Sequence, residues 1–425
     1  MEQKLKIALV GAGMFGGDVH LRVYADLQRG GISGLLGRVG LDDWGRDFAP
    51  IQFELVALAT RNEGSARRAV EKFKSCSGSE PKAYYGQKPW EDILRDFPDL
   101  EVMAVATPDH LHTPVILSAL EAGVHVIAEK PLCLEIQEAD QIVELARQKG
   151  RVVAVDMHKR YDPDHLRIFH DIKGQIGEPL YGTAYLEEPL EVSTSTFKWV
   201  EQSDPFTYVG PHWVDLICHY YKTKPVSLTA VGQKKRLARE GIDAYDAVQV
   251  RVDFANGMSF NFHNNWITPP AFEGTVNQGH EIVGTDGKVE SDQQYRGLRW
   301  WSKGGTSRTA NTHFTREVER PDGSKACVGY GVDSLIAGLA AICRVKFFDA
   351  VPENLADIYP NAEQARIIVA IIHAARLVRD LNFKYLQEGQ GAIVTARFAA
   401  DGITIVDPNC PRVTEVFNRI YEKGL

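Results

Sequence analysis

A glycine-rich turn near the N-terminus constrains the fold of this chain more than any other feature. The apolar segment Leu5–Val10 runs directly into the pattern Gly-x-Gly-x-x-Gly, and a helical segment follows. In such a strand–turn–helix unit the first glycine permits the tight turn, the second lets the backbone approach a pyrophosphate, and the third allows close packing of helix and strand. The helix N-terminus then faces the anion. The expected dinucleotide-binding residues in this turn are Gly11, Gly13, Met14, Phe15 and Gly16.

Strands and helices continue to alternate up to about residue 155, which predicts a doubly wound parallel sheet, a Rossmann fold in an α/β protein. Residues 28–50 interrupt this order with a glycine-rich stretch that is much longer than a usual αβ connection. We interpret the stretch as an ordered surface insertion or an oligomer contact. The expected domains are residues 1–155 for nucleotide binding and residues 156–425 for substrate binding and oligomerisation.

The end of the second expected strand, Phe53–Ala59, bears on the choice of cofactor. An NAD site usually has an acidic residue there that accepts both ribose hydroxyls, but this chain has Thr60 and Arg61. A carboxylate about 4 Å from a 2′-phosphate would repel it by roughly 4 kcal/mol. Without that carboxylate, Arg61 can grip the phosphate and Thr60 can donate a hydroxyl bond. The pattern favours NADP over NAD; the alternative is that Arg61 is solvated and Asn62 binds the ribose.

The next strand, Glu101–Ala106, ends in residues that we also assign to the cofactor edge. Thr107 and Pro108 come directly after it, and His110 and His112 lie at the start of the following helix. Ligands bind at the carboxyl ends of the strands in an open α/β sheet. Two histidines two residues apart resemble a metal pair, but no third ligand follows at a useful spacing, so no metal site is predicted.

A lysine ends the apolar strand that begins at Val124. Glu129 and Lys130 stand at its carboxyl end, and Pro131 stops the strand there. A lysine held by a stiff backbone can be partly desolvated, and its ammonium can then polarise or protonate a substrate oxygen. The alternative is a solvated lysine paired with Glu129.

Four motifs taken together resemble the glucose-fructose oxidoreductase/inositol dehydrogenase (Gfo/Idh/MocA) family. They are the glycine turn, Ala106-Thr-Pro-Asp-His-Leu-His112, Ala122-Gly-Val-His-Val-Ile-Ala-Glu-Lys-Pro131 and Lys159-Arg-Tyr-Asp-Pro163. The resemblance implies a second domain with an open, mainly antiparallel sheet, through which members often pair as homo-oligomers. It also implies hydride exchange between nicotinamide and a sugar, cyclitol or related polyol or sugar acid. Lys130 matches the family's active-site lysine.

The second half begins with a basic segment that leaves the last strand of the first domain. His158, Lys159 and Arg160 could bind substrate hydroxyls there, although Arg160 could equally form a salt bridge at the domain junction. Strands are then expected at 226–232, 247–254, 258–264 and 281–284, with turns at 255–257 and 285–287. Alternating apolar and polar positions indicate an antiparallel sheet with one covered face.

A helix beginning at Pro211 would place His212, Asp215 and His219 on one face. Members of the family commonly carry Asp-x-x-x-His-x-x-Asp here, with the histidine as proton acceptor. His212 and Asp215 match this pattern, whereas Tyr208 replaces the first acid and could donate its hydroxyl to substrate. The resemblance therefore implies that His212 is the general base and that Lys130 stabilises the developing alkoxide. Asp215 could orient the imidazole or form a helix-surface salt bridge.

Composition narrows the partners. A net charge of −8 disfavours nucleic acid, and the chain has no apolar run long enough to span a membrane. Six scattered cysteines and the absence of a leader suggest a cytoplasmic protein with reduced thiols and a small carbohydrate-like substrate. Two alternatives remain. A cofactor-sensing regulator of the same fold is disfavoured because Lys130 and His212 are both present, and an NAD-dependent glycosidase because relatives of that type are often exported.

Overall fold

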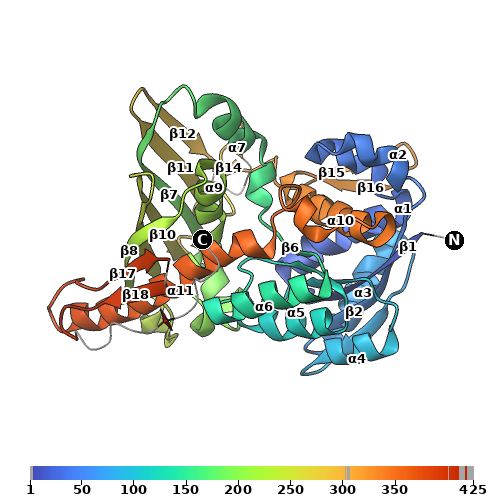
Figure 1. The fold of residues 1–425 in the computed structure, drawn as a ribbon, viewed down its shortest axis with the longest axis horizontal. Coiled ribbons are helices and arrows are strands. Elements are labelled where there is room, and N and C mark those ends of the chain that lie inside the picture. The colour runs from blue at the N-terminus through green and yellow to red at the C-terminus, as the bar shows by residue number, and fades with distance from the viewer. Residues whose placement is uncertain (1–2, 302, 304–306, 401, 411–416, 419–425) are drawn as a thin grey trace. The chain divides into compact units, whose positions relative to one another are not determined.

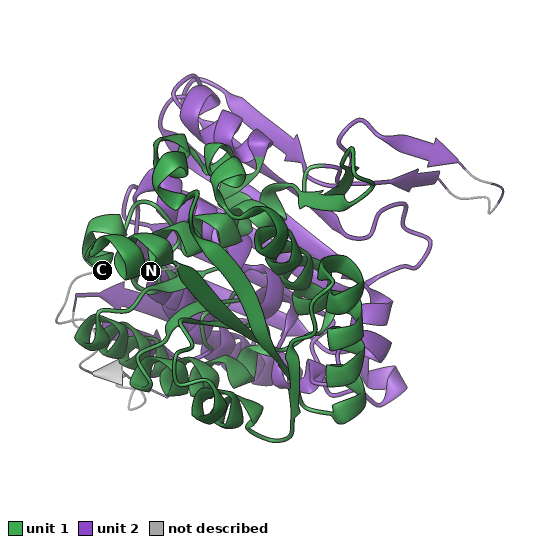
Figure 2. Cartoon of the chain, turned by 90° about the vertical axis from the view of Figure 1, so that its right-hand side faces the viewer, with its two compact units in different colours: residues 1–133, 138–162, 313–365 green, residues 134–137, 163–312, 366–425 purple. Residues whose placement is uncertain are grey.

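The protein is described by a computed structural model over residues 3–301, 303, 307–400, 402–410 and 417–418. The chain forms two compact units, which Figure 2 colours separately. Unit 1 comprises residues 1–133, 138–162 and 313–365, and unit 2 comprises residues 134–137, 163–312 and 366–425. Each unit is built around its own large sheet.

The sheet of unit 1 has the strand order β3-β2-β1-β4-β5-β6, and every neighbouring pair is parallel. Strands β4 and β5 are buried along their length and are apolar except for His125, as expected for strands that are covered on both faces. The predicted Rossmann sheet is therefore confirmed. Its strands are β1 (Lys4–Val10), β2 (Gln52–Thr60), β3 (Lys82–Tyr85), β4 (Val102–Val105), β5 (His125–Ala128) and β6 (Val153–Val155).

The crossover helices of unit 1 cover the two faces of this sheet, as right-handed connections require. One face packs against α1 (Leu21–Gly30) and α3 (Glu63–Ser77), which share a hydrophobic core with the strands. The other crossovers are α4 (Pro89–Asp96), α5 (His112–Glu121) and α6 (Ile136–Lys149). Strand order reverses between β1 and β4, which is where ligands bind in such sheets.

A helix from the C-terminal half completes unit 1, which differs from the expected boundary at residue 155. Helix α10 (Tyr330–Phe348) belongs to the same hydrophobic core as α1 and α3. Because α1 and α3 connect β1 to β3, they leave β5 and β6 exposed on that face, and α10 covers them. The approach is close: a Cβ atom on Gly338 would lie 2.7 Å from the Cβ of Ala154. The ribbon of β15 (Arg316–Glu319) and β16 (Lys325–Val328) precedes this helix.

Residues 28–50 fold as an ordered part of unit 1. They contain two 3₁₀ segments, Ser33–Val39 and Asp42–Trp44, and the short helix α2 (Gly45–Phe48). The Arg344 guanidinium of α10 lies 4.3 Å from the ring centre of Trp44, and Phe48 is fully buried. The insertion therefore packs against α10. Its role as an oligomer contact stays a prediction.

The large sheet of unit 2 is mixed and mainly antiparallel, as the resemblance implied, and only its β7–β10 pair is parallel among the described strands. The turn predicted at 255–257 joins β9 to β10. Its strands, in sheet order, are β12 (Lys288–Asp292), β11 (Asn277–Gly284), β7 (Pro179–Pro189), β10 (Ser259–Thr268), β9 (Ala247–Phe254), β8 (Pro225–Gln233), β17 (Thr395–Ala399), β18 (Gly402–Val406) and β19 (Phe417–Asn418). A separate ribbon pairs β13 (Arg299–Trp301) with β14 (Ser307–Thr309).

One face of this sheet is covered. Along β10, Phe260, Phe262, Asn264 and Trp266 are buried, while the residues that alternate with them are partly exposed. The helices of unit 2 are α7 (Pro163–Arg167), α8 (Pro205–Val209), α9 (Pro211–Tyr221) and the part of α11 (Ala362–Gln387) that follows residue 365. Within the described residues, none of the helices has the length and hydropathy that crossing a membrane requires.

Candidate active site

The glycine turn after β1 is shaped as the sequence predicts. Gly11 has a φ of 97°, and a Cβ atom there would lie 2.2 Å from the carbonyl oxygen of Ala106. A Cβ atom on Gly16 would lie 2.3 Å from the carbonyl oxygen of Gly11. By contrast, nothing lies within 4 Å of the Cβ position of Gly13. The turn is thus tightly packed at Gly11 and Gly16 and open at Gly13, which fits a backbone that a pyrophosphate approaches.

The two side chains inside the turn have different surroundings. Met14 is 47% exposed. The ring of Phe15 stacks on His158, with ring centres 5.5 Å apart, and also contacts Phe314. Phe15 is therefore part of an aromatic cluster, whereas the side chain of Met14 is accessible to a ligand.

At the end of β2, the side chain of Thr60 is engaged within the protein, whereas that of Arg61 is accessible. The Thr60 hydroxyl donates a 2.8 Å hydrogen bond to the carbonyl oxygen of Asn62, so it already supports the turn. Arg61 is exposed at the carboxyl edge of the sheet. Its charge acts on His110, whose pKa is lowered chiefly by burial. Arg61 and His110 therefore lie near one another at the edge of unit 1.

The segment after β4 contains two buried polar groups, the hydroxyl of Thr107 and the imidazole of His112. The Oγ1 atom of Thr107 is buried and makes no hydrogen bond within the described residues. His112 is buried between two backbone carbonyls, with Nδ1 2.7 Å from the oxygen of Pro131 and Nε2 2.9 Å from that of Thr107. Burial lowers the pKa of His112, and a neutral ring can donate to only one of these oxygens at a time. His112 thus joins the segments that follow β4 and β5.

Lys130 lies at the carboxyl end of β5 and is only 7% exposed. The alternative of a solvated lysine is therefore wrong. Glu129 is also buried, and the hydrogen bond that involves its carboxylate joins it to His20. Unit 1 thus presents a largely desolvated amine at the edge that carries the glycine turn, because β1 and β5 run parallel in the same sheet.

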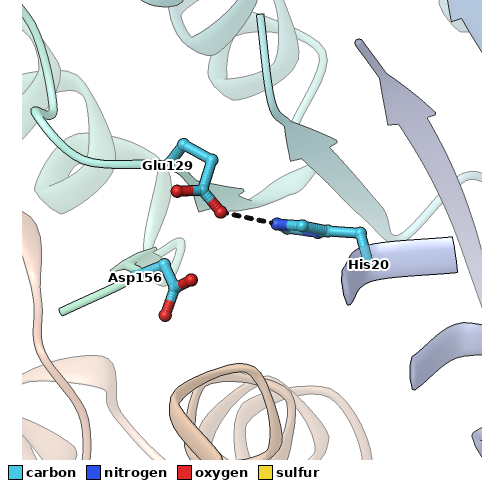
Figure 3. A group of neighbouring side chains, drawn as sticks. All are labelled: His20, Glu129 and Asp156. Carbon is cyan, nitrogen blue, oxygen red and sulfur yellow. Dashed lines mark hydrogen bonds and ion pairs between the residues drawn. The ribbon is translucent and has the colours of Figure 1, made fainter. Parts of the chain in front are cut away.

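Glu129, the residue before Lys130, belongs to a buried polar cluster that the sequence did not reveal. His20 Nε2 lies 2.8 Å from Glu129 Oε1, and Asp156 stands beside them at the end of β6 (Figure 3). Burial and then the charge of Asp156 raise the pKa of Glu129 to about 7. Although burial opposes it, the imidazoles of His158 and His20 hold the pKa of Asp156 below its usual value. The sequence suggested only packing for His20.

The basic segment after β6 is buried rather than solvent-facing. His158, Lys159 and Arg160 lie in a 3₁₀ turn, His158–Tyr161, and all three are buried. His158 lies 3.5 Å from a carboxylate oxygen of Asp156 and contacts Phe314 and Tyr330, and burial lowers its pKa. Arg160 donates a 2.6 Å hydrogen bond to Gln364. These contacts anchor His158 and Arg160 within unit 1.

In unit 2, Pro211 starts α9 as predicted, and His212 and Asp215 are buried on this helix while His219 is partly exposed. Tyr208 lies near the end of the preceding helix, α8, in an aromatic cluster, with its ring centre 4.8 Å from that of Phe197. A surface salt bridge for Asp215 is wrong, because its side chain is buried.

Sequence reasoning missed three further polar residues of unit 2. Asp204 caps α8 by accepting a hydrogen bond from the Thr207 N–H and forms an ion pair with Arg379, so this buried acid near Tyr208 serves the fold. His165 and His280 are buried with ring centres 5.2 Å apart, and both contact Trp213, the neighbour of His212. No local sequence pattern could have predicted these contacts, because His165 and His280 are far apart in the sequence.

Together, the parallel sheet, the glycine turn and the buried lysine define unit 1 as a Rossmann dinucleotide-binding domain of the oxidoreductase type. Residues 5–157 match the family model described as "Oxidoreductase family, NAD-binding Rossmann fold", and residues 172–290 match the "GFO/IDH/MocA C-terminal domain". The chain belongs to the Gfo/Idh/MocA family of oxidoreductases.

Two relatives with named activities share about a quarter of the aligned residues with this chain. The chain is 26% identical over 204 residues to 1,5-anhydro-D-fructose reductase of Ensifer adhaerens, which covers 47% of this chain and 59% of that protein. It is 26% identical over 274 residues to D-glucoside 3-dehydrogenase of Escherichia coli, covering 62% and 68% respectively. The structure of scyllo-inositol dehydrogenase from Lactobacillus casei with bound NAD(H) and scyllo-inositol superposes with a TM-score of 0.62 at 17% identity, covering 90% of this chain and 98% of that one. This structural likeness establishes the fold.

Proposed function

We propose that the chain is an NAD(P)-dependent oxidoreductase that moves a hydride between a nicotinamide dinucleotide and an alcohol carbon of a sugar, cyclitol or related polyol or sugar acid. One observation carries the proposal: a buried lysine, Lys130, ends a strand of the same parallel sheet whose first strand leads into an open glycine turn. Desolvation strengthens the interaction of an ammonium group with a developing negative charge.

The residues of unit 1 fit a dinucleotide. The open backbone at Gly13 would receive the pyrophosphate, and the buried Thr107 hydroxyl without a hydrogen-bond partner would find one in the cofactor. When bound, the nicotinamide ring supplies the carbon that accepts or donates the hydride. The exposed Arg61, together with the absence of an acid at the end of β2, favours NADP over NAD. The remaining proposed cofactor contacts are Met14, Phe15, Thr60, Pro108, His110, His112 and Glu129.

The catalytic roles follow from the chemistry of an alcohol losing a hydride, because the hydroxyl proton must leave as the hydride departs. We assign the base to an imidazole nitrogen of His212, and Lys130 Nζ stabilises the alkoxide oxygen by hydrogen bonding. Asp215 would orient the imidazole, and the Tyr208 hydroxyl would bind a substrate oxygen. His158, Lys159 and Arg160 are the further proposed substrate contacts.

The substrate class rests on what relatives act on. The names of the two relatives described above refer to an anhydrohexose and a glucoside, and the superposed structure holds a cyclitol. These are neutral polyhydroxylated rings of similar size. We therefore propose that the substrate is a carbohydrate-like alcohol. We also propose a cytoplasmic location and a homo-oligomer that forms through the open face of the unit 2 sheet. That face is hollowed to about 460 Å³ and lined by polar groups, including Tyr185, Gln249 and His263.

A substrate survey tests the proposal. The purified chain would be mixed with sugars, cyclitols and their acids in the presence of NAD and, separately, NADP, and reduced nicotinamide would be followed by absorbance. Substrate-dependent accumulation of reduced cofactor is expected for at least one polyol. Cleavage of a nitrophenyl glycoside without net reduction would replace the proposal with a glycosidase. Tight dinucleotide binding without turnover of any substrate would replace it with a sensing protein.

A further inference from the structure

We propose that His20, Glu129 and Asp156 form a binding site for one divalent transition-metal ion of the Mn²⁺-to-Zn²⁺ series. The three residues lie in unit 1, and Glu129 directly precedes Lys130 at the end of β5. This site goes beyond the proposed hydride transfer, which needs no metal. The inference rests on how the ligand atoms converge, on the state of the Asp156 carboxylate and on the second nitrogen of His20.

The ligand atoms already converge. One atom from each residue lies within 4.8 Å of the other two, and Nε2 of His20 is 2.8 Å from Oε1 of Glu129. Two ligands about 2.1 Å from a metal are about 3.0 Å apart at octahedral angles and about 3.4 Å apart at tetrahedral angles, so this pair would separate by only about 0.2–0.6 Å to coordinate an ion. Figure 3 shows the two carboxylates and the imidazole turned toward a common space from three separate segments.

Asp156 supplies the independent observation. Its side chain is 1% exposed, and neither carboxylate oxygen has a hydrogen-bond partner within the described residues. The Nδ1 atom of His158 lies 3.5 Å away, at ion-pair distance. His158 and the side chain of Ser334 are polar neighbours of this carboxylate, and neither meets it in hydrogen-bonding geometry. A buried carboxylate with such long contacts is costly, and a coordinated cation is one of the few groups that offset the cost. The carboxylate therefore points to a ligand in the space that it shares with Glu129.

The second nitrogen of His20 is held as in metal sites. Nδ1 lies 3.0 Å from the hydroxyl oxygen of the buried Tyr24, one helical turn further along the chain. Imidazoles that bind a metal through one nitrogen usually donate the N–H of the other to an oxygen, which fixes the tautomer and the ring orientation. In the tautomer that donates Nδ1–H to Tyr24, the lone pair of Nε2 faces Glu129 and Asp156, and the proton of the 2.8 Å hydrogen bond to Glu129 belongs to the carboxyl group, from which a bound ion would displace it.

The composition of the site selects the ion. One imidazole nitrogen with two carboxylates suits borderline dications such as Mn²⁺, Co²⁺ and Zn²⁺, whereas Mg²⁺ and Ca²⁺ prefer oxygen ligands alone. The two carboxylates match the double charge of the ion. A bound ion would tie the π-helical turn Gly16–His20 to the ends of β5 and β6. It would thereby stiffen the strand end that carries Lys130.

Metal binding to the full-length protein tests the site. Protein stripped with a chelator would be titrated with Co²⁺, Mn²⁺, Zn²⁺ and Mg²⁺ by calorimetry, and Co²⁺ would also be followed through its visible absorption. Wild-type protein should bind one Co²⁺, Mn²⁺ or Zn²⁺ ion per chain and Mg²⁺ far more weakly. Tyr24→Phe should weaken binding by about 10- to 100-fold. Asp156→Asn and His20→Gln should weaken it more than Tyr24→Phe does.

The matched control is Asp18→Asn, which alters an exposed carboxylate on the same π-helical turn as His20 and should leave metal affinity unchanged. Circular dichroism would establish that each variant is folded, and Glu129→Gln would replace any ligand variant that is not. Wild-type protein that takes up none of the three transition metals at one ion per chain would overturn the proposal. Equal metal affinities in wild type and in folded Asp156→Asn would overturn it as well. The cluster would then be a pair of buried acids, Glu129 and Asp156, that share a proton.

Discussion

The Nδ1 atom of His112 lies 2.7 Å from the carbonyl oxygen of Pro131, the residue that follows the buried Lys130. Through its other nitrogen the same ring reaches the carbonyl oxygen of Thr107 at 2.9 Å. A side chain from the start of α5 therefore connects the segments that leave β4 and β5. Both segments lie at the edge to which we assign the cofactor and the catalytic lysine.

Replacing this ring should loosen the edge. His112→Leu removes the ring that reaches the two carbonyl oxygens, and losing a buried hydrogen bond costs about 1–3 kcal/mol. We expect the free energy of unfolding to fall by that amount, with weaker dinucleotide binding. Urea unfolding and fluorescence titration measure the two effects. His110→Leu, at a half-buried position in the same turn, should lower the free energy of unfolding clearly less. An equal loss of stability in both variants would argue that His112 does not connect the two segments.

Two substitutions in the glycine turn should have different effects, one on dinucleotide binding and the other on stability. Gly13→Ala should fold normally, because the added methyl group has open space, yet it should impair dinucleotide binding where the pyrophosphate is expected. Gly11→Ala should instead destabilise the protein, because its Cβ would lie 2.2 Å from a backbone oxygen at a φ of 97°. Thermal unfolding with and without NADP distinguishes the two. A stable Gly13→Ala variant with normal affinity would place the pyrophosphate elsewhere.

The cofactor preference depends on Arg61 in our account. Arg61→Ala should weaken NADP binding by roughly 10- to 100-fold, as expected for the loss of a charge-assisted hydrogen bond, and should leave NAD binding nearly unchanged. Dissociation constants for both cofactors provide the measurement. The matched control is Arg67→Ala, which removes an exposed arginine of α3 that pairs with Glu63. An unchanged ratio of NADP to NAD affinity in Arg61→Ala would refute the preference.

Acid should destabilise unit 1 through His125. This buried imidazole accepts a 3.0 Å hydrogen bond from the Val152 N–H, and burial lowers its pKa from 6.5 to about 3. Below pH 6.5 the unfolded chain binds a proton that the folded chain does not, so stability falls as the pH drops from 6.5 toward 3. The contribution is about 1.4 kcal/mol per pH unit.

Urea unfolding across that pH range measures the slope. His125→Asn retains an acceptor but does not titrate, so its stability should decline less steeply with acid than that of the wild type. His170→Asn, at an exposed position, should keep the wild-type slope. Parallel curves for wild type and His125→Asn would show that another group controls the acid response.

Local patterns were sufficient to predict much of this fold. The Rossmann strands, the glycine turn and the start of α9 at Pro211 follow from short-range periodicity and turn chemistry. Helix α10 was not predicted, because Tyr330–Phe348 is apolar on most sides and lacks the amphipathic period of a surface helix. Its return to unit 1 is a long-range effect: the connections between β1 and β3 leave a face of β5 and β6 that some other segment must cover.

The candidate site divides in the same way. Lys130 and His212 were identified by motif, because each lies in a short run with a recognisable neighbourhood. The cluster of His20, Glu129 and Asp156 could not be, since its members come from the ends of three different strand–helix units. Only the contact between His20 and Tyr24 could have been predicted, because the two residues are four apart on one helical face.

The central claim is that the Lys130 amine stabilises an alcohol oxygen as its carbon exchanges a hydride with nicotinamide. The most direct measurement compares wild type with Lys130→Met in steady-state turnover of the best polyol and in dinucleotide affinity, with the exposed Lys72→Met as control. We predict that Lys130→Met lowers kcat by about 100- to 1,000-fold while cofactor affinity stays near that of the wild type. Turnover by Lys130→Met within a few-fold of the wild-type rate would contradict the account.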